Sequence, residues 1–129
     1  MLDNNTRESI GPGVAAALAE DVGAGDLTAS LIDADAVVGA QILAREALVV
    51  CGQAWVDEVF RQLDETVVVD WYVVDGGRAD DGDIICKLVG PARPILIGER
   101  TALNFLQTLS ATATTTAAYV DAIAGTAAK

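Results

Sequence analysis

The segment from Pro94 to Gln107 reads PILIGERTALNFLQ, and its pattern predicts a helix. Proline suits the first turn of a helix, because its missing N–H is not needed there and its φ is already helical. The apolar residues recur at spacings of three, four and seven, which predicts one buried face made of Ala102, Phe105, Leu106 and Leu109. A helix with such a face packs against a core, so the domain is expected to be built around it.

A second face of this helix carries polar side chains at the same spacing, namely Arg100, Asn104, Gln107 and Thr108. Arg100 and Asn104 lie one turn apart and point the same way, away from the apolar face. Most polar helix faces are simply solvated. An arginine flanked by amide side chains can also present donors to an anion or to another subunit, and the pattern alone leaves both interpretations open.

Composition limits the classes of function. The chain has 129 residues, enough for one domain with a modest core. Its net charge of −11, from 19 acidic and 8 basic residues, argues against nucleic-acid partners and against an anionic membrane surface. It still allows one local cationic site. No apolar run approaches the roughly 20 residues of a membrane span, and Met1–Ile10 lacks the apolar stretch of a signal peptide. We therefore expect no membrane partner and a cytoplasmic location.

The chain contains no histidine, which excludes a histidine base, a Ser–His–Asp triad and histidine metal ligands. Its two cysteines, Cys51 and Cys86, each lie in an apolar run that resembles a strand. We expect buried, reduced thiols here in preference to a disulfide or a metal site.

The N-terminal part predicts a polar leader, a helix and a turn. Residues 1–12 are polar, and Val14–Glu20 is rich in Ala and Leu and predicts a helix. Gly23 and Gly25 are expected to end this helix. In the following Gly25–Thr28 turn, Asp26 is placed to bond backbone N–H groups.

The remaining pattern predicts an α+β domain with a mostly antiparallel sheet and helices on one side. The predicted strands are Ala36–Ala44, Ala47–Cys51, Thr66–Val74 and Ile84–Val89. The predicted helices are Gln53–Leu63, the helix from Pro94 and a second helix around Thr115–Ala124. Gly90-Pro91 is expected to end the last strand, and Ile85 is expected to share a face with Lys87 and Val89, opposite Cys86 and Leu88.

Two stretches carry a resemblance to a known family. Gly98–Lys129 is similar to the segment ERTALNFLQxLSGxAT of quinolinate phosphoribosyltransferase, also called nicotinate-nucleotide pyrophosphorylase (carboxylating). Glu20–Ile32 (EDVGAGDLTASLI) resembles its signature EDxGxGDxT, and the DG…GD…G…AR…ER pattern from Asp75 to Arg100 adds weaker support. The resemblance implies the family's N-terminal α/β sandwich domain over residues 1–109 and the first helical segment of its α/β-barrel domain over residues 110–129. A chain of this extent is expected to be inactive alone.

The implied reaction converts quinolinate and phosphoribosyl pyrophosphate to nicotinate mononucleotide, pyrophosphate and CO2 in de novo NAD biosynthesis. The two carboxylates of quinolinate call for arginine donors. In the family, the arginine that matches Arg100 reaches across a homodimer interface to a quinolinate carboxylate, so the resemblance implies substrate binding by Arg100. Asn104 is expected either to support Arg100 or to cap a neighbouring loop. No catalytic or metal-binding residue is assigned; Mg²⁺, which neutralises the leaving pyrophosphate, would be held by residues outside this chain.

The sequence departs from the family at three positions. Ala111 replaces a usual Gly, which would cost stability if φ were positive there. Ala118 and Ala127 stand where basic residues are common, and losing them would weaken an anion site.

Two alternative functions are considered. One is a related phosphoribosyltransferase that acts on another pyridine or nucleobase. The other is a non-enzymatic β-rich binding module of the biotinyl or lipoyl type. That module needs a lysine at a hairpin tip, whereas Lys87 is predicted to lie mid-strand.

Overall fold

The computed structural model describes residues 3–29, 31–33 and 35–127, and within them it has three helices and five strands. The side chains of residues 22–29 and 124–127 are not described. In chain order the elements are α1 (Asn4–Ala29), β1 (Val37–Leu43), β2 (Leu48–Val49), α2 (Gln53–Leu63), β3 (Val68–Trp71), β4 (Arg78–Ala79), β5 (Ile84–Pro91) and α3 (Ala92–Ala127).

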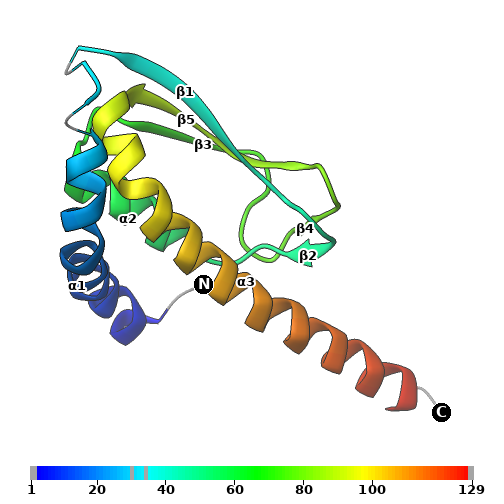
Figure 1. Ribbon diagram of the computed structural model, residues 1–129. Coiled ribbons are helices and arrows are strands. Elements are labelled where there is room, and N and C mark those ends of the chain that lie inside the picture. Colours follow the sequence, from blue (N-terminus) through cyan, green and yellow to red (C-terminus); the bar gives the residue numbers. More distant parts are fainter. Residues whose placement is uncertain (1–2, 30, 34, 128–129) are drawn as a thin grey trace.

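The strands form two antiparallel sheets. The larger has the order β1-β5-β3, so β5 is its central strand, and β2 pairs with β4 in the smaller one. All three helices lie on one side of the larger sheet (Figure 1). The opposite side is open, and valines on it such as Val37 and Val68 are mostly exposed. The predicted α+β class, with a mostly antiparallel sheet and helices on one side, is confirmed.

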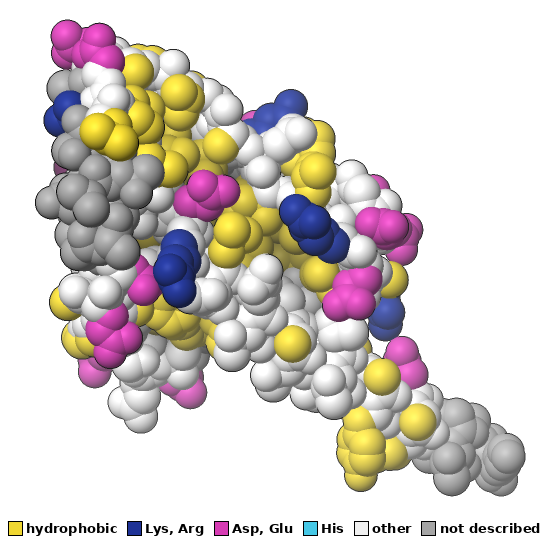
Figure 2. Space-filling view, in the orientation of Figure 1, with side chains coloured by type: hydrophobic (Ala, Val, Ile, Leu, Met, Phe, Trp, Pro, Cys, Tyr) yellow, Lys and Arg dark blue, Asp and Glu magenta, His cyan; other side chains and the backbone are white. Residues whose placement is uncertain are grey.

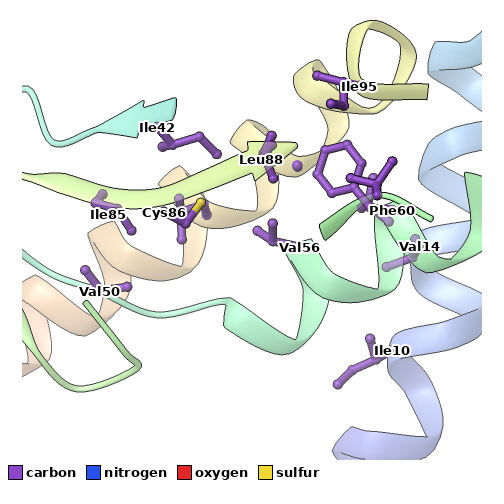
Figure 3. Close-up of a cluster of buried hydrophobic side chains, with 14 of the residues drawn as sticks. Ile10, Val14, Ile42, Val50, Val56, Phe60, Ile85, Cys86, Leu88 and Ile95 are labelled. Atoms are coloured by element: carbon purple, nitrogen blue, oxygen red, sulfur yellow. The ribbon is translucent and has the colours of Figure 1, made fainter. Parts of the chain in front are cut away.

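The core lies between the sheet and the helices (Figure 3). The inner face of the sheet contributes Ile42 from β1 and Leu88 from β5, which point toward Val56 and Phe60 of α2. The other two helices complete the cluster, with Ile10, Val14 and Ile95 among their buried residues. The helix predicted at Gln53–Leu63 has the observed bounds of α2, because its apolar periodicity coincides with the face that buries Val56, Val59 and Phe60.

A β-bulge in β5 corrects the predicted alternation. Ile42 pairs with Cys86, whereas the next residue, Leu43, pairs with Ile84, which leaves Ile85 as the extra residue. Ile85 and Cys86 are therefore both buried. The expectation that Ile85 shares the outer face of Lys87 was wrong, because a bulge shifts the side-chain alternation by one residue.

Helix α1 is longer than predicted at both ends. It begins at Asn4, where a polar leader was expected, and Asp3 caps its start by accepting a hydrogen bond from the N–H of Thr6 (2.7 Å). It also continues past Gly23 and Gly25 to Ala29, so the predicted turn at Gly25–Thr28 was wrong. Helix α1 as a whole packs against α2 and α3, and such packing supplies most of the stability of helices in proteins. The predicted bonding by the Asp26 side chain lies outside the described side chains.

Helix α3 is one continuous element where two helices were predicted. It begins at Ala92, because β5 extends through Pro91, so Gly90-Pro91 does not end the strand before the helix. Its C-terminal part projects beyond the rest of the domain (Figure 1). Ala111 has helical backbone, and no described non-glycine residue has positive φ. The backbone strain that a positive φ would cause at Ala111 is therefore absent. Ala118 is an exposed residue of the same helix, and the side chain of Ala127 lies outside the description.

Helix α2 is capped from a distance. The N-cap residue, Gly52, has no side chain that could accept hydrogen bonds from the first N–H groups of the helix. Instead, Oδ1 of Asp75 accepts hydrogen bonds from the N–H groups of Gly52 and Gln53, both at 3.0 Å. The predicted turn at Asp75–Gly77 is confirmed by the hydrogen bond from the Gly77 N–H to the Val74 carbonyl (2.9 Å), and this turn supplies the cap that the local sequence lacks.

Helices α2 and α3 meet at Gly98. A Cβ at this position would lie 2.7 Å from Cδ1 of Leu63, 2.8 Å from Cε1 of Phe60 and 3.1 Å from Cγ1 of Val59. Such distances are shorter than van der Waals contact, so only glycine allows the helices to approach this closely. Gly98 precedes Arg100 by two residues, so this contact also determines how far the polar face of α3 stands from the core.

We predict opposite effects for alanine at two helical glycines. Gly98→Ala should lower the free energy of unfolding by about 1–3 kcal/mol, because buried side chains must move to admit the methyl group. Gly13→Ala, in α1, should raise it by up to about 1 kcal/mol, because nothing lies within 4 Å and alanine favours helix. Urea denaturation of both variants measures the two signs. Equal stabilisation by both would contradict the close helix contact.

Candidate functional site

The polar face of α3 forms a shallow depression of about 300 Å³. The side chains that line it are Leu96, Glu99, Arg100, Leu103, Asn104 and Gln107. Arg100, Asn104 and Gln107 are exposed, whereas Ala102 and Leu106 on the opposite side are buried. The structure thus places Arg100 and Asn104 together on one exposed face, as their spacing predicted. All six lining residues belong to one helix, so the depression has only one wall.

Arg100 has no hydrogen bond or ion pair with another described residue. Three other arginines of the domain are engaged: Arg61 pairs with Glu58, Arg78 with Asp121 (3.3 Å), and Arg93 donates to the carbonyl of Ile32 (2.8 Å). The chain has a net charge of −11, so it contains many acidic side chains, yet none of the described ones pairs with Arg100. Its donors therefore remain available for a planar anion such as a carboxylate.

The depression is not a complete anion site. Glu99 lines it beside Arg100, so its one positive and one negative side chain cancel in formal charge. Basic side chains on the face shown in Figure 2 lie apart from one another, with acidic side chains among them. A ligand with two negative charges would need further cations, and the lining residues do not contain them.

The first half of α3 is held by three contacts that the sequence analysis missed. The N–H of Ala92 donates to the carbonyl of Ala36 (2.9 Å), and the Arg93 side chain donates to the carbonyl of Ile32. The hydroxyl of Thr101 donates to Oδ2 of Asp21 (2.6 Å). Asp21 and Thr101 lie in the two stretches that carry the family resemblance. A contact between those two stretches could therefore have been predicted from the sequence.

A second depression, of about 470 Å³, lies between α1 and α2 and is lined by Arg7, Glu8, Ile10, Gly11, Ala54 and Glu58. Two carboxylates face a single arginine there. Hydrogen bonds from Arg61 hold the pKa of the Glu58 carboxyl below its ordinary value, which keeps it ionised and engaged. This depression offers no free cation cluster for an anionic substrate.

The cysteines do not form a nucleophilic or metal site. Both are free thiols, as predicted; Cys86 is fully buried, as expected, whereas Cys51 is only half-buried. Burial raises the pKa of Cys86 to about 12 and also raises the pKa of Cys51, which keeps both thiols protonated at neutral pH. Burial raises the pKa of Asp57 too, although the Trp71 indole N–H donates to it (2.8 Å). Among the described residues, no group of three or more acidic or cysteine side chains could hold a metal ion.

Lys87 lies within β5, opposite Gln41 of β1 and Asp70 of β3, and its ammonium sits 5.2 Å from the centre of the Tyr72 ring. This placement is mid-strand, as predicted, and is not the hairpin tip that a carrier module requires. In the described part of the chain, no helix is long and apolar enough to span a membrane.

Residues 26–110 match the protein family described as the N-terminal domain of quinolinate phosphoribosyl transferase. Among curated proteins, the chain is 40% identical over 97 residues to the probable nicotinate-nucleotide pyrophosphorylase (carboxylating) of Bacillus subtilis, covering 75% of this chain and 34% of that protein. It is 38% identical over 108 residues to the chloroplastic nicotinate-nucleotide pyrophosphorylase of rice, covering 82% of this chain and 29% of that protein.

Solved structures agree with these relatives. The nicotinate-nucleotide pyrophosphorylase of Francisella tularensis superposes with a TM-score of 0.80 at 39% identity, over 84% of this chain and 38% of that one. A structure from Streptococcus pyogenes, titled NadC, gives a TM-score of 0.83 at 34% identity, over 95% of this chain and 43% of that one. The fold is therefore of the class of α+β domains that form part of nicotinate-nucleotide pyrophosphorylases. The chain spans about a third of the length of the curated relatives. It belongs to the quinolinate phosphoribosyl transferase N-terminal domain family.

The raised pKa of Cys86 predicts a measurable pH dependence. The folded thiol keeps its proton up to about pH 12, whereas the unfolded thiol loses it near its ordinary pKa of 9.0. The unfolded state therefore binds fewer protons above pH 9, and stability falls as pH rises. The difference in unfolding free energy between the protein and Cys86→Ala should shrink by about 1 kcal/mol from pH 9 to 10. Urea titrations at pH 7, 9 and 10 measure it; a constant difference would contradict the burial of the thiol.

Proposed function

We propose that this domain serves an enzyme that converts quinolinate and phosphoribosyl pyrophosphate to nicotinate mononucleotide, pyrophosphate and CO2 in NAD biosynthesis. Membership of the family and the names of the relatives support this reaction. Because the chain spans about a third of those relatives, the domain is proposed to contribute part of the site and to be inactive alone. The contribution of this chain to the reaction is then substrate binding by side chains of α3.

The observation that carries the proposal is the free guanidinium of Arg100. In this proposal Arg100 binds one carboxylate of quinolinate through charge-assisted hydrogen bonds, for which its planar donor fork is suited. Asn104 lies one turn further along the same face and supports that contact with its amide. Neither residue transfers a proton or forms a bond to the substrate, so both are binding residues.

The one-walled shape of the depression supports a site shared between subunits. All of its lining residues come from α3, and Glu99 offsets the charge of Arg100. We propose that a second subunit of a homodimer supplies the opposite wall and the remaining cations. Residues outside the described chain would hold the Mg²⁺ that neutralises pyrophosphate, since no group of described residues is suited to it.

The proposed location is the cytoplasm. Two free thiols fit a reducing compartment. The net charge of −11 also fits the absence of a nucleic-acid or anionic membrane partner. The printed names of plant relatives place those proteins in chloroplasts or mitochondria.

A chimera tests the role of Arg100. In it, this chain replaces the matching segment of the Bacillus subtilis relative, which restores a full-length protein. Arg100→Ala should raise the KM for quinolinate about 10- to 100-fold, because a hydrogen bond to a charged group is lost. The KM for phosphoribosyl pyrophosphate should change less than about threefold, since the lost contact belongs to one substrate. Steady-state kinetics with each substrate varied in turn measures both.

Arg45→Ala is the matched control, because Arg45 is another exposed arginine without a described partner and lies outside α3. It should leave both KM values unchanged. An equal rise of both KM values in Arg100→Ala, or the same rise in Arg45→Ala, would contradict a carboxylate-binding role.

The shared site predicts that the chimera is a dimer or a larger assembly at assay concentration. Light scattering after size exclusion, at two protein concentrations, measures its mass. The Arg100→Ala chimera should have the same mass, because loss of a substrate contact does not dissociate the subunits. A fully active monomer would overturn the proposal that two subunits share the site.

A further inference from the structure

A partly buried hydrogen bond lies directly beside Arg100. The hydroxyl of Thr101 donates to Oδ2 of Asp21 at 2.6 Å, and Thr101 is only 1% exposed. This length is within the range of charge-assisted O–H···O⁻ bonds, which are stronger than neutral ones. The bond joins α3 to α1 across 80 residues of sequence.

The position of Arg100 depends on the backbone of α3. Its side chain makes no hydrogen bond or ion pair with another described residue, so no neighbour fixes its direction. Its location follows from the rotation and the axial position of the helix. Gly98 sets the distance of α3 from α2, and Arg93 anchors its first turn to the carbonyl of Ile32.

The Thr101–Asp21 bond is a further tie, and it is the described side-chain hydrogen bond of α3 that lies next to Arg100 in the sequence. Adjacent residues of an α-helix are about 100° apart around its axis. Thr101, which is buried, therefore lies at the edge of the buried face of α3, on the side adjoining Arg100. A directional hydrogen bond at this edge resists rotation of the helix about its axis.

We propose that Asp21 is a positioning residue for substrate binding. Through Thr101 it holds α3 in the rotation that presents Arg100 to a substrate carboxylate. This inference rests on the proposed function of Arg100. It explains in physical terms why the EDVGAGD and ERTALNF stretches meet in the fold: one stretch carries the binding arginine and the other sets its direction.

If Asp21 acted on the substrate through its charge, removing that charge would change the KM for quinolinate in the opposite direction from loss of positioning. A carboxylate near an anion site repels the anion, so removing its charge would tighten binding. Asp21→Asn separates the two roles, because it removes the charge and keeps an oxygen that accepts the Thr101 hydrogen bond. Positioning predicts little change in this variant, and electrostatics predicts a lower KM for quinolinate.

The experiment uses the chimera described above with steady-state kinetics and thermal denaturation. Thr101→Val removes the hydroxyl with little change of shape and should raise the KM for quinolinate about 5- to 10-fold, with the KM for phosphoribosyl pyrophosphate unchanged. Asp21→Ala, which breaks the same bond from its less buried end, should have the same effect and serves if the valine variant does not fold. Thr101→Ser and Asp21→Asn should stay within twofold of the parent.

Ser110→Ala is the matched control. Ser110 is also a buried hydroxyl of α3, 3% exposed, and it bonds both the N–H (2.9 Å) and the carbonyl (3.1 Å) of Cys51. It lies about three turns beyond Arg100. Its loss should lower the melting temperature while leaving the KM for quinolinate unchanged.

Three results would overturn the inference: an unchanged quinolinate KM in Thr101→Val and Asp21→Ala, an equal rise in Ser110→Ala, or a lower KM in Asp21→Asn. Arg100→Ala separates this failure from failure of the proposed function. If Arg100→Ala raises the KM while Thr101→Val does not, only the positioning role fails. If Arg100→Ala has no effect, the binding role fails and the positioning role fails with it.

Discussion

The close contact of α3 with α2 at Gly98 is the constraint on which the rest of the domain depends. Without a Cβ at this position, α3 lies directly against Phe60 and Leu63, and the same two helices close one side of the core under the sheet. Ties at Ile32, Ala36 and Asp21 then fix the first half of α3 to the segment from α1 to β1. The polar face with Arg100 is displayed only because the opposite face is held so closely.

Features determined by short-range pattern were predictable from the sequence. The apolar spacing of Trp55, Val59 and Leu63 predicted α2 with its observed bounds, and the spacing in α3 separated its buried and exposed faces. Features determined by distant partners were not. The cap of α2 comes from Asp75, and the bulge at Ile85 arises only when β5 pairs with β1. The glycines near the end of α1 predicted a stop, whereas the helix continues through them to Ala29.

The candidate site divides in the same way. Periodicity alone placed Arg100 and Asn104 on one exposed face, and a substrate for that face came only from the resemblance. Periodicity could not reveal that Arg100 lacks an ion-pair partner, because 19 acidic residues offered many. Nor could it reveal the Thr101–Asp21 bond, whose members are 80 residues apart. Helical periodicity predicts the direction in which a side chain points, but it does not predict which residues that side chain contacts.

The charge balance of the depression has a consequence for the proposed assembly. A single arginine beside a glutamate gives a dianion no net attraction at the domain surface, where solvent also weakens each charge. When a second wall covers Arg100, the same hydrogen bonds form in a drier environment and become stronger. Under the proposed function Arg100 binds substrate only in the assembled site, and we expect the isolated domain not to bind dicarboxylates. In the proposed arrangement the acidic surface of the domain and Arg100 have complementary roles: the acidic surface disfavours anion binding elsewhere, and Arg100 contributes where cations from another subunit converge.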